Sequence, residues 1–422
     1  RLLSGETNYM GTTHTHFLFM PKEKYYEDHP DWYSSNGKHL RLINEEMTLE
    51  FIEQVKQFLR DYPQASLVFI GIEDDSSAFS AEDAVKTKEL YNTNEAGLNI
   101  VFLNKVIRAV EEWLPTEFPG RTVNYRTLAY YSHFDAPVDY DPETDTFTPH
   151  SEYVIPHEKL NIHFTPIGMP SWTQPIHSEA NSSVDINIRK WSAITDNMSI
   201  YSYGINFRNY LMNFNDFSSF QANVRYCLGL GFNGYYQQGA INSVTSSFEE
   251  MRIYVQSQLM WNTALDYKDL CEEFIRVYYG DASEQMLEYF DLTVVNNAIN
   301  TEENNLSQGT TTGAPGAAVY YPFELVNRML TLFEEAEKAL EPLRSADEDL
   351  YSVMLNRVRQ QKVTQLYLAL NHYSRNFSQA KVREMLNEME TTCASNGILR
   401  VDENDSSSGI QSLIEKWRTD IQ

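Results

Sequence analysis

The sequence predicts an α/β protein: a (β/α)8-type TIM barrel, whose first strands are expected to be missing from this chain, followed by a C-terminal α-helical domain. Three observations predict this fold. Strand-like and helix-like segments alternate six times, which is typical of a parallel sheet. The longest loops follow the strands, as in barrels that build their active sites from those loops. From Asp266 onward only amphipathic helical patterns remain.

The predicted strands are short apolar runs rich in β-branched and aromatic residues, bounded by turn-forming residues. They cover residues 13–20, 66–72, 122–131, 160–165, 198–203 and 232–237. The helices between them have apolar residues at i, i+3 and i+4 spacing, and they cover residues 48–60, 96–114, 184–194, 217–230 and 248–261. Residues 133–157 form a long polar loop in this scheme. Its acidic residues lack the glycine and the closing glutamate of a calcium loop, so we predict no calcium site there.

The remainder of the chain is predicted to form a bundle of amphipathic helices. These helices cover residues 267–279, 283–296, 322–340, 347–373 and 378–391, with a last helix at about 409–421. Residues 300–318 interrupt the bundle and have the composition of a loop. We therefore expect a barrel domain over residues 1–265 and a helical domain over residues 266–422.

The composition excludes several classes of function. The net charge of −26 argues against nucleic acid and anionic membrane surfaces, which require basic patches. No run approaches the ~18 apolar residues of a membrane span. The three cysteines, Cys227, Cys271 and Cys393, form no CxxC pair and predict no zinc site. The chain has no HExxH motif, glycine-rich phosphate loop or nucleophile elbow, so we expect no metal and no cofactor. The oligomeric state stays open.

The strand predicted over residues 66–72 ends in three consecutive carboxylates, Glu73, Asp74 and Asp75. Carboxylates inside a buried strand would be costly to desolvate, whereas carboxylates at its C-terminal end can face a cleft. In α/β folds and barrels that edge of the sheet carries the ligand site. A substrate-facing role is therefore one interpretation. The other is that these acids are solvated loop residues or cap the next helix.

Further candidates lie on or after other predicted strands. His16 is a possible sugar ligand, with a hydrogen-bonded structural role as the alternative. Ring faces can pack on sugars and tyrosine hydroxyls can donate to them, but aromatic residues are also ordinary core material. The aromatic candidates are Tyr130, Tyr131, Trp172, Tyr203 and Tyr236. Gln237 can hydrogen-bond a sugar hydroxyl or acetamide group. One of Tyr130 and Tyr131 is expected to pack inward.

Several strings, taken in order, resemble one bacterial family over about residues 1–290. They include Gly71-Ile72-Glu73-Asp74-Asp75, Leu128-Ala129-Tyr130, Gly234-Tyr235-Tyr236-Gln237-Gln238-Gly239 and Leu259-Met260-Trp261-Asn262. The sequence is similar to domain of unknown function 4838. The resemblance implies a relation to glycoside hydrolase family 163, which comprises endo-β-N-acetylglucosaminidases acting on N-glycans, and to the barrels of α-glucuronidases. Many members of the family have glutamate where this chain has Gln237, and an amide cannot act as a general acid or nucleophile.

The first hypothesis is a secreted or cell-surface bacterial glycoside hydrolase that acts on N-acetylglucosamine-containing or acidic glycans. A retaining reaction needs a proton donor and either a second carboxylate or the acetamido oxygen of the substrate itself. We assign Glu73 as the proton donor and Asp74 as the orienting carboxylate, with the reverse assignment left open. The chain begins with Arg1 and shows no signal peptide, so we expect a mature or trimmed product.

Two alternatives belong to other classes. Gln237 motivates a catalytically impaired carbohydrate-binding protein on the same barrel fold. A third hypothesis is a structural or surface-display module. A carboxylate pair facing a cleft would favour the hydrolase, and aromatic residues with a single carboxylate would favour the binding protein.

Overall fold

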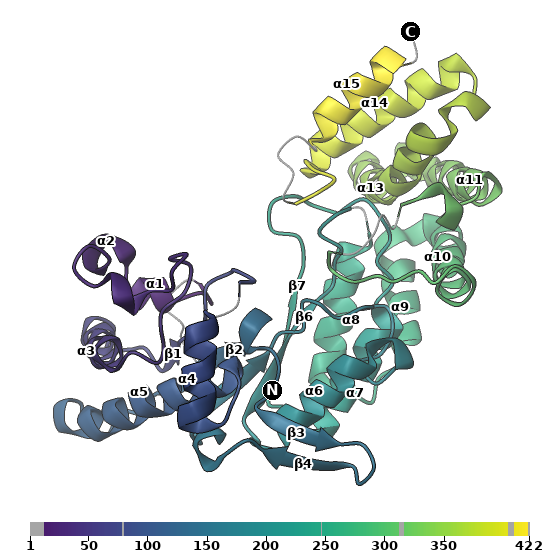
Figure 1. Cartoon of the computed structure of the whole chain (residues 1–422). Coiled ribbons are helices and arrows are strands. Elements are labelled where there is room, and N and C mark those ends of the chain that lie inside the picture. The colour runs from purple at the N-terminus through teal and green to yellow at the C-terminus, as the bar shows by residue number, and fades with distance from the viewer. Residues whose placement is uncertain (1–11, 78–79, 246, 312–315, 404–408, 421–422) are drawn as a thin grey trace. The chain divides into compact units, whose positions relative to one another are not determined.

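The computed structural model describes residues 12–77, 80–245, 247–311, 316–403 and 409–420, and the chain folds into two compact units (Figure 1). The first unit comprises the described residues up to 167, together with residues 182–202 and 226–236. The second unit comprises residues 168–181, residues 203–225 and the described residues from 237 onward. The two units therefore alternate along the chain. The predicted domain boundary after residue 265 stays a prediction.

A five-stranded sheet in the order β1–β2–β5–β6–β7 confirms the predicted α/β class. Its strands are β1 (Leu67–Phe69), β2 (Asn124–Ala129), β5 (Leu160–Phe164), β6 (Met198–Tyr203) and β7 (Gly234–Gln238). The pairs β1–β2, β2–β5 and β5–β6 are all parallel. Within the described residues the curled sheet has an edge at β1 and another at β7, so it is a half-barrel and the closed TIM barrel is not confirmed.

Helices connect the strands, as parallel pairing requires. In chain order, α4 (Ala81–Tyr91) and α5 (Glu95–Glu117) connect β1 to β2, α6 (Ser182–Ser192) connects β5 to β6, and α7 (Phe217–Gly229) connects β6 to β7, whereas α3 (Glu45–Asp61) precedes β1. Of these, α4 was not predicted. Ser80 caps its first turn, because Ser80 Oγ accepts the Asp83 N–H at 3.1 Å and donates to Asp83 Oδ2 at 3.0 Å. The Ser80-x-x-Asp83 spacing is the sequence signal that could have found this helix.

The strand predicted over residues 13–20 is wrong. The segment forms a helical turn, α1 (His16–Phe19), which is followed by α2 (Lys22–Tyr25). Thr15 explains the difference, because its hydroxyl donates to the Phe69 carbonyl at 2.7 Å and accepts the Gly71 N–H at 3.0 Å. The segment thus contacts the end of β1 at Thr15 and then forms a helix instead of pairing with β1 as a strand. A short apolar run cannot distinguish these two outcomes.

Gly71 allows this close contact, and its substitution gives a testable prediction. A Cβ at Gly71 would lie 2.0 Å from the Thr13 carbonyl oxygen, so the backbone would have to shift. We expect Gly71→Ala to lower the free energy of unfolding by roughly 2 kcal/mol, measured by urea denaturation. Gly229→Ala is the matched control, because no atom lies within 4 Å of its Cβ position. Equal unfolding midpoints for the two variants would contradict the prediction.

The predicted polar loop at residues 133–157 contains a hairpin, formed by β3 (Val138–Asp141) and β4 (Thr146–Pro149). Tyr140 stacks on Phe147 across the two strands, with ring centroids 4.9 Å apart. The Asp141 carboxylate accepts the Glu143 N–H at 2.9 Å and closes the turn. Cross-strand pairing therefore orders this acidic stretch, although its composition resembles that of a loop.

Buried polar side chains cross the sheet from β2 to β6. Arg126 Nε donates to Asn161 Oδ1 at 3.0 Å, and Ser199 Oγ donates to the same oxygen at 2.5 Å. The His163 ring lies 2.7 Å from Ser199 Oγ through Nδ1. Burial, helped by the positive charge of Arg126, lowers the pKa of His163 to about 3.

This lowered pKa predicts a loss of stability in acid. The unfolded chain binds a proton at His163 near pH 6.5, whereas the folded chain resists it until about pH 3. The contribution of His163 to the free energy of unfolding is therefore fully present above pH 6.5. It decreases as the pH drops, by about 2 kcal/mol at pH 5. His163→Gln should flatten the dependence of urea midpoint on pH between 6.5 and 5. An unchanged slope would contradict the prediction.

The second unit contains the predicted helical bundle. The helices that correspond to the prediction are α9 (Tyr267–Tyr279), α10 (Ser283–Glu303), α11 (Phe323–Leu340), α13 (Glu348–Tyr373), α14 (Gln379–Asn396) and α15 (Ile410–Asp420). The unit also contains α8 (Glu249–Trp261), which was predicted within the barrel domain, and α12 (Leu343–Ala346), which was not predicted. A continuous apolar core is shared by α11, α13, α14 and α15. None of the helices in the described part of the chain combines the length and apolarity that crossing a membrane requires.

Candidate functional site

A carboxylate and a tyrosine meet where the first two strands end. Asp74 follows β1 by a few residues, and Tyr130 directly follows β2. The Tyr130 hydroxyl donates a hydrogen bond of 2.8 Å to Asp74 Oδ1. The Tyr130 ring is buried, whereas Asp74 is exposed. The pair thus presents a carboxylate of fixed orientation to solvent at the C-terminal edge of a parallel sheet, where α/β proteins bind ligands.

Glu73 is half-buried and is held by the neighbouring turn. Its Oε1 accepts the backbone N–H of Phe17 at 2.8 Å. Asp75, by contrast, makes its contacts within the neighbouring loops. Lys38 Nζ lies 2.7 Å from it and Ser77 also donates to it, and these hydrogen bonds lower the pKa of the Asp75 carboxyl well below its usual range. Of the three consecutive acids, only Asp74 is exposed.

Tyr131 lies beside Tyr130, with ring centroids 4.0 Å apart. Its φ of 45° is in the left-handed region, which a bulky side chain rarely adopts. Strain of this kind is common at functional sites. Tyr130 is buried and Tyr131 is half-buried, as expected for one tyrosine packing inward.

His16 lies close to these residues, but the structure does not support its predicted role as a sugar ligand. It is 2% exposed and packs edge-on against Phe51 and Phe102. Burial, together with the neighbouring His39 and His14, lowers the pKa of His16 to about 3. His16 is therefore part of the packed core. His14 lies nearer the edge, with Nδ1 2.6 Å from the Ile72 carbonyl oxygen.

Two of the aromatic candidates are buried in the second unit. Trp172 is 3% exposed and Tyr203 is 4% exposed, and their rings meet edge-to-face at 5.7 Å. Neither ring has an exposed face, so these contacts do not favour Trp172 or Tyr203 as a surface for sugar packing. Tyr236 differs, because it is 49% exposed in the first unit and leans on Tyr201 at 4.6 Å. Tyr236 remains a candidate for contact with a ligand.

Gln237 belongs to a buried charged network in the second unit. Its Nε2 donates to Asp216 Oδ2 at 2.7 Å, and Arg252 Nε donates to Asp216 Oδ1 at 2.8 Å. Gly204 makes room for the amide, since a Cβ there would lie 2.1 Å from Gln237 Nε2. Among the described residues Gln237 Oε1 has no hydrogen-bond partner. Sequence reasoning missed Asp216 and Arg252, although an acid directly before a helix was a visible signal.

The predicted site residues thus fall into two groups. The first unit contains Glu73, Asp74, His16, Tyr130, Tyr131 and Tyr236, and the second contains Trp172, Tyr203 and Gln237. Across the described ranges, no cluster of three or more histidine, cysteine, aspartate or glutamate side chains has an arrangement that could hold a metal ion. The strand ends carry the carboxylates of Glu73 and Asp74 and the hydroxyls of Tyr130 and Tyr131.

Comparisons with known proteins give one family. Residues 3–291 match the family described as Domain of unknown function (DUF4838). No curated protein matches the chain. Among solved structures the chain is similar to a GH138 enzyme targeting pectin rhamnogalacturonan II, with 8% sequence identity and a TM-score of 0.38. The match covers 92% of this chain and 60% of that one.

Proposed function

The chain belongs to the DUF4838 family, and from this premise we propose that it is a carbohydrate-active protein whose activity is glycoside hydrolysis. One observation carries the proposal. An exposed carboxylate, Asp74, lies at the C-terminal edge of a parallel sheet with one oxygen fixed by the Tyr130 hydroxyl. Carboxylates held in this way at strand ends are the groups that glycosidases use.

The contacts favour a division of roles between the two acids. Asp74 Oδ1 accepts a hydrogen bond from Tyr130, so Asp74 acts as the ionised group that stabilises positive charge on the sugar or orients an acetamido oxygen. Glu73 Oε1 already accepts an N–H, which leaves Oε2 to carry the proton for the leaving oxygen. These are the roles expected from the sequence, and the reverse assignment is the alternative.

The proposed substrates are N-acetylglucosamine-containing or acidic glycans, cleaved with retention as in the endo-β-N-acetylglucosaminidases that the sequence resembles. Such substrates imply a secreted or cell-surface location. The test is product release by the full chain from a panel of N-glycans, aryl N-acetylglucosaminides and uronic acid-containing oligosaccharides. Release from at least one class supports hydrolysis, and the anomer formed first, seen by NMR, tests retention.

A second candidate function is glycan binding without catalysis. The contacts of Gln237 favour it. The Gln237 amide is hydrogen-bonded to Asp216, and a glutamate at this position would instead supply a second carboxyl group beside Asp216. An amide can hydrogen-bond a ligand but cannot transfer a proton as a carboxyl group does. Calorimetric binding of the same panel without any product would support this candidate over the hydrolase.

A further inference from the structure

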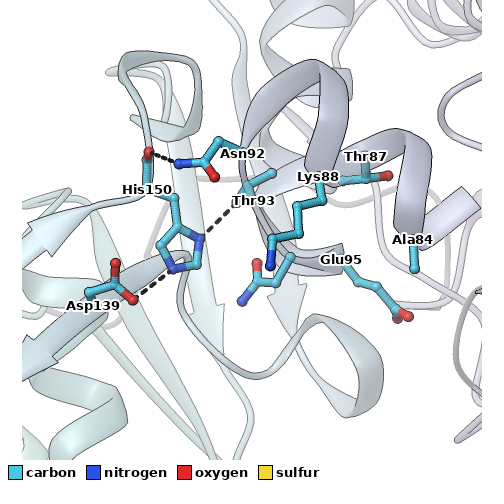
Figure 2. A pocket seen from close by; sticks show the side chains of 9 residues that line it. Ala84, Thr87, Lys88, Asn92, Thr93, Glu95, Asp139 and His150 are labelled. Atoms are coloured by element: carbon cyan, nitrogen blue, oxygen red, sulfur yellow. Dashed lines mark hydrogen bonds and ion pairs between the residues drawn. The ribbon is translucent and has the colours of Figure 1, made fainter.

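The first unit contains a pocket that the proposed catalytic residues do not line. Its volume is about 500 Å³, and it lies between the α4–α5 junction and the β3–β4 hairpin (Figure 2). Lys88 and Asn92 line it from the end of α4, Glu95 from the start of α5, and Asp139 and His150 from the hairpin. The α4–α5 junction follows β1 in the chain and the hairpin follows β2, the two strands whose ends carry Asp74 and Tyr130.

One wall of this pocket is held in place by His150. Its Nδ1 lies 3.1 Å from Thr93 Oγ1, and its Nε2 lies 3.5 Å from Asp139 Oδ1. Asn92 Nδ2 donates to the His150 carbonyl oxygen at 3.2 Å, as the dashed lines of Figure 2 show. These contacts join the helix junction to the hairpin. Because these side chains are already ordered, a ligand would lose less binding free energy to ordering them.

The charges of the pocket restrict its ligand. Burial lowers the pKa of His150, so its ring is neutral at pH 7. Lys88 contributes one positive charge, whereas Glu95 and Asp139 contribute two negative charges, which leaves a net charge of −1. An anionic ligand would meet this excess of negative charge. Within the described ranges Lys88 has no ion pair, and Figure 2 shows its amine directed into the space beside Thr93.

The mixture of groups also indicates what would bind. Lys88 can only donate hydrogen bonds, and carboxylates such as Asp139 can only accept them. Each sugar hydroxyl does both, so an uncharged sugar can satisfy both kinds of group at once. Pockets that bind small molecules typically have volumes of about 300–1,000 Å³, and this volume lies within that range. No phenylalanine, tyrosine or tryptophan side chain lines the pocket among the described residues, so we expect recognition to depend on hydroxyl positions rather than on stacking on such rings.

We infer that this pocket is a subsite for one uncharged sugar residue of the glycan, held by Lys88 and Asp139 against the wall fixed by His150. The inference rests on the proposed function, because it assigns part of the same substrate to the loops beyond the same strand ends. It gives the protein a neutral-sugar preference at a position separate from Asp74.

Binding of simple glycosides to the full chain tests the inference. The probes are the methyl β-glycosides of glucose, galactose and N-acetylglucosamine, with galacturonic acid as the anionic comparison, measured by calorimetry. Hydrogen exchange locates the binding by protection of residues 88–95 and 139–150. We expect at least one neutral glycoside to bind there. Lys88→Met and Asp139→Asn should each weaken it roughly tenfold, since the first removes a charged donor and the second removes the charge of the acceptor.

Lys86→Met is the matched control, because Lys86 is on the same helix but pairs with Glu82 at 2.6 Å and does not line the pocket. Three results would overturn the inference: no neutral glycoside protects these segments, galacturonic acid binds more tightly, or Lys88→Met and Lys86→Met bind equally. Asp74→Asn separates the two proposals. If Asp74→Asn leaves turnover intact while the pocket still binds, the catalytic assignment fails and the subsite stands.

Discussion

Asp74→Asn is expected to lower glycan hydrolysis by the full chain more than about a hundredfold without unfolding it. The amide keeps the size of the side chain and can still accept the Tyr130 hydrogen bond, but it cannot carry the negative charge that stabilises an oxocarbenium-like transition state. Asp74 is exposed, so its exchange should change the free energy of unfolding by less than about 0.5 kcal/mol. The measurement is kcat and KM on whichever substrate of the panel the parent cleaves.

Companion variants show whether the loss is specific. Tyr130→Phe removes only the hydroxyl that orients Asp74, so kcat should fall less, by about tenfold. Glu73→Gln should also lower kcat strongly, because an amide cannot transfer a proton to the leaving oxygen. Asp61→Asn, an exposed acid at the end of α3, is the control for a lost charge and should leave turnover unchanged. Full turnover in both Asp74→Asn and Glu73→Gln would contradict the site assignment.

Arg252→Met is expected to destabilise the protein by about 3–5 kcal/mol, the largest effect on stability that we predict. Arg252 and Asp216 are both buried and joined at 2.8 Å, and Arg252 also donates to the backbone carbonyls of Ser247 and Phe214. Methionine fills similar space but leaves the Asp216 carboxylate buried without its cation, which is more costly than the pair was worth. Urea denaturation of the parent and the variant measures the difference.

The double variant Asp216→Asn, Arg252→Met should recover part of this loss, because it removes the uncompensated charge. Arg276→Met is the control, since Arg276 makes its ion pairs with Glu272 and Glu284 at the surface, where such pairs contribute about 0–1 kcal/mol. A loss below about 1 kcal/mol for Arg252→Met, similar to that of the control, would contradict the account of the network.

Gln237 connects this network to the question of activity. Gln237→Glu would place a second carboxyl group at hydrogen-bond distance from Asp216, where two like charges cannot both ionise easily. We expect the variant to be less stable than the parent near pH 7 and to regain stability as the pH falls and the pair takes up a proton. Stability that is independent of pH relative to the parent would contradict this expectation.

The sequence alone determined the positions of the sheet strands and of most helices. Apolar runs with turn residues at both ends identified β2, β5, β6 and β7, and i, i+3, i+4 spacing identified the long helices of the second unit. The same patterns put Asp74 and Tyr130 at strand ends, and parallel strands bring such ends to one edge. Local pattern is sufficient for this because periodicity and edge position are properties of contiguous residues.

Only the tertiary structure decided which side chains meet solvent and which meet each other. It showed that His16 and Trp172 are buried, that residues 13–20 turn away from β1 instead of joining the sheet, and that the sheet is a half-barrel. It also joined Asp216 to Arg252, and His150 to both Asp139 and Thr93. These contacts join residues from different segments of the chain. The burial of a side chain depends on every segment that packs around it. A local pattern of residues therefore determines neither the contacts nor the burial.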